Sequence, residues 1–225
     1  LGIWAYHAEA VAICRNALSG AVPDDLADSL QADLFQNAVI SAETVAEAVT
    51  LPRRTGRSAA WGVNDALQAA TSADGGAITL PALDRISPDS MGAVYALLVL
   101  TWAGEFEAAG RICDTVLADA RRRGSMSMVA HASCLHSMIM RRLGRLEEAA
   151  DAARLALDFK LATSPPLAVA WAAALGLEAL TRLGRLDEAD AMAAVAAERE
   201  PPEGWIHTLT FRQARGALRV AQHRP

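Results

Sequence analysis

The chain of 225 residues has few aromatic residues and few cysteines, and Lys160 is its only lysine. Aromatics make up 5 % of the sequence. The cysteines Cys14, Cys113 and Cys134 are odd in number and far apart, which argues against a disulfide framework and fits a reducing cytosol. The formal net charge of −5 disfavours a surface that grips phosphates. We therefore predict a cytoplasmic segment that does not itself bind nucleic acid.

Long apolar runs and catalytic motifs are also missing. The longest apolar stretches, 91–103 and 167–177, are too short to span a bilayer, so we interpret them as buried helices and expect no membrane partner. A P-loop needs a glycine-rich turn that ends in Lys-Ser or Lys-Thr, and Lys160 does not occur in one. The sequence contains no nucleophile elbow, paired-histidine zinc helix or dinucleotide-binding fingerprint. We predict that this segment is not an enzyme and holds no cofactor.

What the sequence does contain is a motif that recurs every 40 residues. Gly104, Gly144 and Gly184 mark its three copies. A large apolar residue stands four positions before each glycine and another two positions after it, and an alanine follows three further on: Leu100, Phe106 and Ala109; Met140, Leu146 and Ala149; Leu180, Leu186 and Ala189. A fixed period of this size indicates an array of helical repeats. Each glycine is expected to end a helix and permit a tight reversal, because glycine tolerates positive φ.

Helical periodicity and stop signals divide the chain into two parts. We predict irregular N-terminal helices over 1–87, either degenerate repeats or a cap, with a long loop at 71–87. Repeats of period 40 follow over 88–225, the last of them truncated. Ser87-Pro88 and Ser164-Pro165 are read as an N-cap followed by a first-turn proline. The helices are predicted at 3–18, 24–37, 41–50, 57–71, 88–102, 105–123, 126–143, 146–161, 165–183, 186–199 and 203–222.

The repeated pattern resembles the tetratricopeptide repeat. The resemblance covers 100–109, 140–149 and 180–189, with a period of 40 in place of about 34 and with Leu and Met largely replacing the aromatic residues of that family. It implies an all-α fold, a tetratricopeptide-like right-handed superhelix of antiparallel helix pairs. Such arrays present long concave surfaces, which favours a binding function.

A narrower resemblance involves the runs AGEFEAAGRICDTVLADARRRGS (103–125), RRLGRLEEAADAARLAL (141–157) and RLGRLDEADAM (182–192). These runs resemble the helical-repeat middle region of large ATP-binding regulators of the LuxR type, an architecture shared with the maltose regulon activator. The resemblance implies a sensor or interaction segment that binds a small-molecule inducer or a protein partner. The ATPase and DNA-binding domains would lie elsewhere in the full-length protein. No catalytic residue is carried over.

In tetratricopeptide-like arrays the first helix of each pair lines the inner groove. By alignment with the repeat, the ligand-binding or partner-binding candidates on that face are Arg142, Trp171, Glu178 and Arg182. Arginine and tryptophan in one groove would suit a carboxylate, a phosphate, a sugar or an acidic peptide. The alternative is that the tryptophan packs between repeats and the arginines form a solvated face.

Two other clusters are read as structural. His131 and Cys134 share a helix face, but His136 points about 140° away from His131 and about 160° away from Cys134, so we predict no metal site. Arg121 to Arg123 complement a helix dipole. Two further hypotheses for the whole chain stay open: a stand-alone tetratricopeptide-like adaptor that binds a peptide or protein, and an accessory domain of an enzyme.

Overall fold

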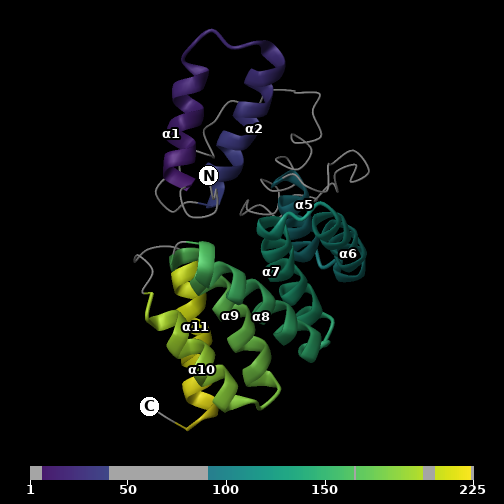
Figure 1. The fold of residues 1–225 in the computed structure, drawn as a ribbon, viewed down its shortest axis with the longest axis vertical. Helices are drawn as coiled ribbons and strands as arrows, with labels where there is room; N and C mark the ends of the chain where they lie inside the picture. Colours follow the sequence, from purple (N-terminus) through teal and green to yellow (C-terminus); the bar gives the residue numbers. More distant parts are fainter. Residues whose placement is uncertain (1–6, 41–90, 165, 200–205, 224–225) are drawn as a thin grey trace. The chain divides into compact units, whose positions relative to one another are not determined.

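The computed structural model describes residues 7–40, 91–164, 166–199 and 206–223 of the chain (Figure 1). Within these ranges every regular element is an α-helix and there is no strand, so the predicted all-α class is confirmed for the described residues. The chain divides into two compact units, Leu1–Gly104 and Glu105–Pro225.

The first unit contains α1 (His7–Leu18), α2 (Asp24–Ile40) and α5 (Met91–Trp102). Helices α1 and α2 pack against each other, and their positions confirm the helices predicted from the first forty residues. The predicted helices at 41–50 and 57–71, the loop at 71–87 and the Ser87-Pro88 cap lie outside the described residues.

The second unit is built from six described helices, whose ends lie within three residues of the predicted ones. Consecutive helices pack side by side from α6 to α10, and α7 and α11 also contact α9. The helices are α6 (Phe106–Arg122), α7 (Met126–Arg142), α8 (Leu146–Thr163), α9 (Pro166–Arg182), α10 (Leu186–Ala197) and α11 (Ile206–Ala221).

Glycine ends the first helix of each pair, as the repeat predicts. Gly144 and Gly184 adopt φ of 77° and 75°, a left-handed conformation that other residues rarely reach. The N–H of Arg145 donates to the carbonyl of Met140 at 2.9 Å, and that of Arg185 donates to Leu180 at 3.0 Å. These bonds satisfy carbonyls that the helix ends leave free. The chain therefore reverses in a few residues, and the helices of a pair pack against each other.

Small residues and one central helix form the core of this unit. The alanines that the repeat places in the second helices, Ala109, Ala149 and Ala189, are fully buried, which lets neighbouring helix axes come close together. Helix α9 contacts α7, α8, α10 and α11, and all its residues from 167 to 177 are buried. The interpretation of that apolar stretch as a buried helix is confirmed.

A proline stands in the first turn of α9, as the sequence predicts, and the helix is described from Pro166 onward. Ser164 is the C-cap of α8, with the extended backbone angles φ −118° and ψ 156°. The predicted helix start at Ser164-Pro165 includes Pro165, which lies outside the described residues.

Candidate functional site

The candidate site lies where the carboxyl ends of α7 and α9 come together. Helix α7 ends in Arg141 and Arg142, and α9 carries Glu178 and Arg182 in its last two turns. Helices α7 and α9 are in contact, although they belong to successive repeats. We call these four residues the arginine cluster.

An ion pair joins the two helices within the arginine cluster. Nη1 of Arg141 lies 2.8 Å from a carboxylate oxygen of Glu178, and the two side chains are only 13 % and 20 % exposed. Burial lowers the pKa of Arg141, and the negative charge of Glu178 opposes that shift. Arg142 and Arg182 add to the lowering, so Arg141 lies within electrostatic reach of the other three groups.

The arginine cluster contains more positive than negative groups. Arg142 and Arg182 are exposed, and in the described part of the chain neither forms an ion pair or a side-chain hydrogen bond. They occupy equivalent positions 40 residues apart. The cluster thus contains three guanidinium groups and one carboxylate, and that carboxylate pairs with Arg141. Since a guanidinium offers paired donors to carboxylate and phosphate oxygens, the cluster is suited to an anionic group.

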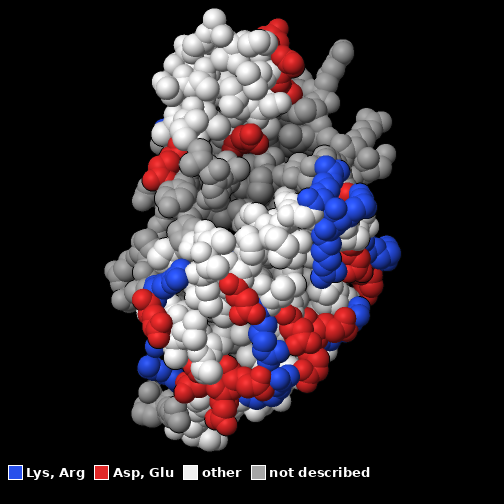
Figure 2. All heavy atoms as spheres, in the orientation of Figure 1, with Lys and Arg blue, Asp and Glu red and all other residues white. Residues whose placement is uncertain are grey.

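Elsewhere on the face of this unit drawn in Figure 2, acidic and basic side chains are interspersed. The ion pairs reflect this: Arg185 pairs with both Glu147 and Glu188, and Arg154 pairs with Asp151 and Glu188. Surface pairs of this kind contribute little and leave no free guanidinium for a ligand. The two free arginines of the cluster are therefore distinct from the paired arginines of these helices.

The structure does not bring Trp171 together with the arginine cluster. Trp171 is buried, and its ring stacks on His207 of α11 with centroids 5.2 Å apart and planes inclined by 25°. It stands seven residues before Glu178, about 10 Å along the helix axis. Arg142, Glu178 and Arg182 each lie near Arg141, whereas Trp171 packs between helices. The alternative interpretation of the sequence placed the tryptophan between repeats and the arginines on a solvated face, and Arg142 and Arg182 are exposed.

A buried polar cluster beside Trp171 was not expected. The side chain of Lys160 is buried, with Nζ 5.9 Å from the centroid of the Trp171 ring, and in the described part of the chain Nζ has no hydrogen-bond acceptor. Burial lowers the pKa of Lys160. The sequence could have indicated the burial of Lys160, because it lies on the same helix face as Ala153 and Ala156. Both alanines are buried.

His131 lies close to Lys160. Its Nδ1 donates to the carbonyl of Ser127 at 2.8 Å. Burial and the positive charge of Lys160 lower the pKa of His131 to about 3, against the effect of that hydrogen bond. His136 instead pairs with Asp114 at 3.4 Å. Within the described ranges no three His, Cys, Asp or Glu side chains converge as metal ligands would.

Among the helices that the structure describes, none is both long enough and apolar enough to cross a bilayer. Comparison with known proteins gives no match: no family model, no curated protein and no solved structure is significantly similar to this chain.

Proposed function

We propose that this chain is a non-enzymatic helical-repeat sensor or interaction segment, and that its arginine cluster binds an anionic group of an inducer or a protein partner. The observation that carries the proposal is the pair of free, exposed guanidinium groups on Arg142 and Arg182, held beside the Arg141–Glu178 ion pair. That ion pair fixes the α7 and α9 ends relative to each other, so the two free arginines are positioned before a ligand arrives.

In this proposal the helix pairs form a tetratricopeptide-like right-handed superhelix. Three features support it: the glycine turns at a period of 40, the buried alanines at the crossings, and the direct contacts of α9 with both α7 and α11. Contacts between the first helices of successive pairs are what an inner face requires. The arginine cluster lies at the ends of two such helices.

We further propose that the segment belongs to a LuxR-type transcription regulator, as the resemblance of its repeats implies. A ligand that prefers one arrangement of the array would then shift how the array packs against ATPase and DNA-binding domains. Sequencing the gene on both sides of this segment tests that context. A P-loop upstream and a helix-turn-helix downstream support it. A start codon immediately before residue 1 and a stop codon after residue 225 favour the alternative, an adaptor that binds a peptide.

The binding proposal has its own test. Fluorescence anisotropy with a fluorescein-labelled glutamate-rich peptide should show saturable binding to the wild-type chain. Changing both Arg142→Gln and Arg182→Gln should weaken it by about tenfold, since each lost contact to an exposed arginine contributes roughly 0.5–1 kcal/mol. The matched control is Arg122→Gln, an exposed arginine that already pairs with Asp119. Equal loss in the control and the double variant would contradict a role for the arginine cluster.

A further inference from the structure

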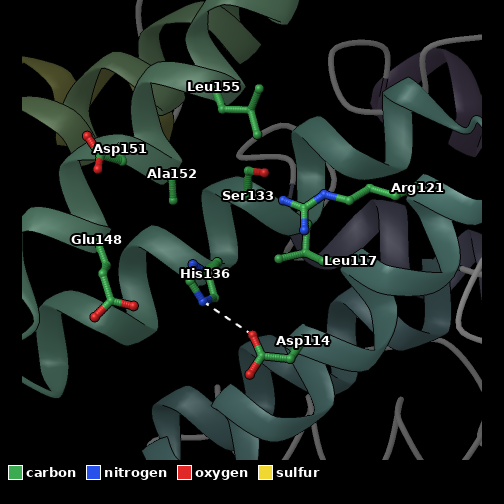
Figure 3. Close-up of a pocket in the computed structure, with 9 residues that line it drawn as sticks. All are labelled: Asp114, Leu117, Arg121, Ser133, His136, Glu148, Asp151, Ala152 and Leu155. Carbon is green, nitrogen blue, oxygen red and sulfur yellow. Dashed lines mark ion pairs between the residues drawn. The ribbon is translucent and has the colours of Figure 1, made fainter.

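The second helical unit contains a pocket that shares no residue with the arginine cluster. It lies between α6 and α8, over α7, and has a volume of about 390 Å³ (Figure 3), within the range of small-molecule sites. Helix α6 contributes Asp114, Leu117 and Arg121, and α7 contributes Ser133 and His136. The α8 wall includes Ala152 and Leu155.

The repeat explains why this groove is hollow. The equivalent groove one repeat later, between α8 and α10, is filled by Met192 of α10, which packs against Gly176 of α9 so closely that a Cβ there would lie 2.3 Å from the methionine sulfur. Forty residues earlier, Ala152 stands in place of Met192, and His136 in place of Gly176. The side chain that would fill the groove is missing from α8, and an imidazole has been placed in the hollow.

Charge also keeps the first groove open. In the later groove Arg154 of α8 lies 2.6 Å from Glu188 of α10, so an ion pair bridges the two helices. The equivalent positions in the first groove are Asp114 and Glu148, two acids that repel each other. Glu148 turns to Arg145 on its own helix instead, at 2.5 Å. No ion pair therefore closes the α6–α8 groove in the described structure.

Two donors in the pocket have no partner. The side chain of Ser133 is only 2 % exposed and lines the pocket, yet within the described residues it makes no hydrogen bond. In the same ranges the Arg121 guanidinium forms no ion pair, and in Figure 3 it extends from α6 toward the side of the pocket where the Ser133 hydroxyl lies. In the later groove the residue equivalent to Ser133 is Ala173, and the residue equivalent to Arg121 is Leu161. The two donors are therefore specific to this pocket.

An acceptor group stands opposite these donors. Asp114 lies 3.4 Å from Nε2 of His136. Burial lowers the pKa of His136 more than Asp114 raises it, so the imidazole is neutral at pH 7 and leaves the Asp114 carboxylate without a full counter-charge. The acids of the α8 wall are already neutralised, since Glu148 pairs with Arg145 and Asp151 with Arg154. The pocket thus presents one free cation, one uncompensated anion and an apolar wall among its described residues.

We propose that this pocket binds a small zwitterion, an α-amino acid with an apolar side chain. The carboxylate of the ligand pairs with Arg121 and accepts a hydrogen bond from Ser133. Its ammonium group donates to Asp114 beside His136. The apolar side chain lies against Leu117, Ala152 and Leu155, where the methionine of the later repeat would otherwise be. The Ser133 hydroxyl lines the pocket and makes no hydrogen bond within the described residues, so the ligand carboxylate supplies its acceptor.

Isothermal titration calorimetry on the 225-residue chain tests the proposal, with L-leucine, L-methionine and L-phenylalanine as probes. 3-Methylbutylamine and 4-methylpentanoate serve as the two halves of leucine, each lacking one charged group. At least one amino acid should bind saturably, and for leucine each half should bind about tenfold more weakly or worse, because one charge-assisted contact is lost. Binding by none of the three amino acids, or binding of the amine as tight as that of leucine, would overturn the proposal.

Substitutions of the pocket residues test whether an amino acid binds in this pocket. Arg121→Gln should remove the advantage of the amino acid over the amine, and Asp114→Asn should remove its advantage over the carboxylate. Arg122→Gln is the matched control, because Arg122 stands next in the chain, is 72 % exposed and pairs with Asp119. Ala152→Met puts into α8 the residue that α10 carries, so it should abolish binding while the melting temperature stays the same or rises. Amino-acid binding that survives in Ala152→Met would place the site elsewhere.

Discussion

The two grooves of the second unit are built by the same repeat, yet one is filled and the other is open. Between α8 and α10, Met192 occupies the space above Gly176, and Arg154 pairs with Glu188 across the helices. Between α6 and α8 the equivalent residues are Ala152, His136, Asp114 and Glu148, and a pocket of about 390 Å³ remains. The repeat therefore sets the path of the backbone, while a few side chains decide whether a groove serves packing or is free to bind.

The largest expected effect comes from emptying the filled groove. Met192→Ala should lower the free energy of unfolding by about 3 kcal/mol, because it removes buried methylene and sulfur atoms and leaves a cavity above Gly176. Urea denaturation followed by circular dichroism measures the change. Met126→Ala is the control, since Met126 is 48 % exposed and should change stability by no more than about 0.5 kcal/mol. Similar losses for both variants would show that Met192 does not fill the groove as described.

An intermediate effect on the free energy of unfolding is expected from pH, because only one of three equivalent buried residues can be protonated. His131, Trp171 and Phe211 are buried at equivalent positions 40 residues apart, and only the first can take up a proton near neutral pH. The pKa of His131 is lowered to about 3 in the folded chain. The unfolded chain therefore binds the proton first as the pH falls below about 6.5, and stability is lost progressively between about pH 6.5 and 3.

From pH 7 to pH 5 this histidine should reduce the free energy of unfolding by about 2 kcal/mol. His131→Phe, which installs the type of residue found at the equivalent position of the last described helix, should remove that part of the dependence and leave the contribution of the carboxylates unchanged. Urea denaturation of both proteins at several pH values measures the difference. Identical slopes for the two proteins would contradict a neutral, buried His131.

The smallest effect should come from opening the ion pair across the filled groove. Glu188→Gln removes the partner of Arg154 and Arg185, and because these groups are exposed the stability should fall less than in either case above. The difference from wild type should shrink as salt is added, since exposed charges are screened. Melting curves at low and high salt measure it. Asp187→Asn, in the same first turn of α10 but without a described ion pair, is the control.

Sequence reasoning located the helices and turns because their causes are local. A glycine that can adopt positive φ ends a helix wherever it stands, and alanine spacing marks the crossings. The same repeat alignment found Arg142 and Arg182, which are equivalent positions. It did not single out the pairing of Arg141 with Glu178, because their equivalents, Thr181 and Met138, carry no charge.

The pocket was missed for a different reason. In the sequence, the pattern around His136 suggests only a possible metal ligand, and the exchange of Met192 for Ala152 one repeat earlier looks like an ordinary substitution between apolar residues. Comparing the volumes of equivalent residues across the repeats would have revealed the missing side chain. Sequence comparison alone does not say that Ala152 and His136 face the same space, since they lie on different helices.

The sequence by itself determined that this chain is helical, where its helices turn back and which positions repeat, because hydrogen bonding within a helix and the conformational freedom of glycine depend on neighbours in the chain. The tertiary structure decided which charges meet and which groove stays open. Those outcomes depend on distances and volumes between side chains that the helices bring together from far apart in the sequence, such as Arg141 with Glu178 and Asp114 with Glu148.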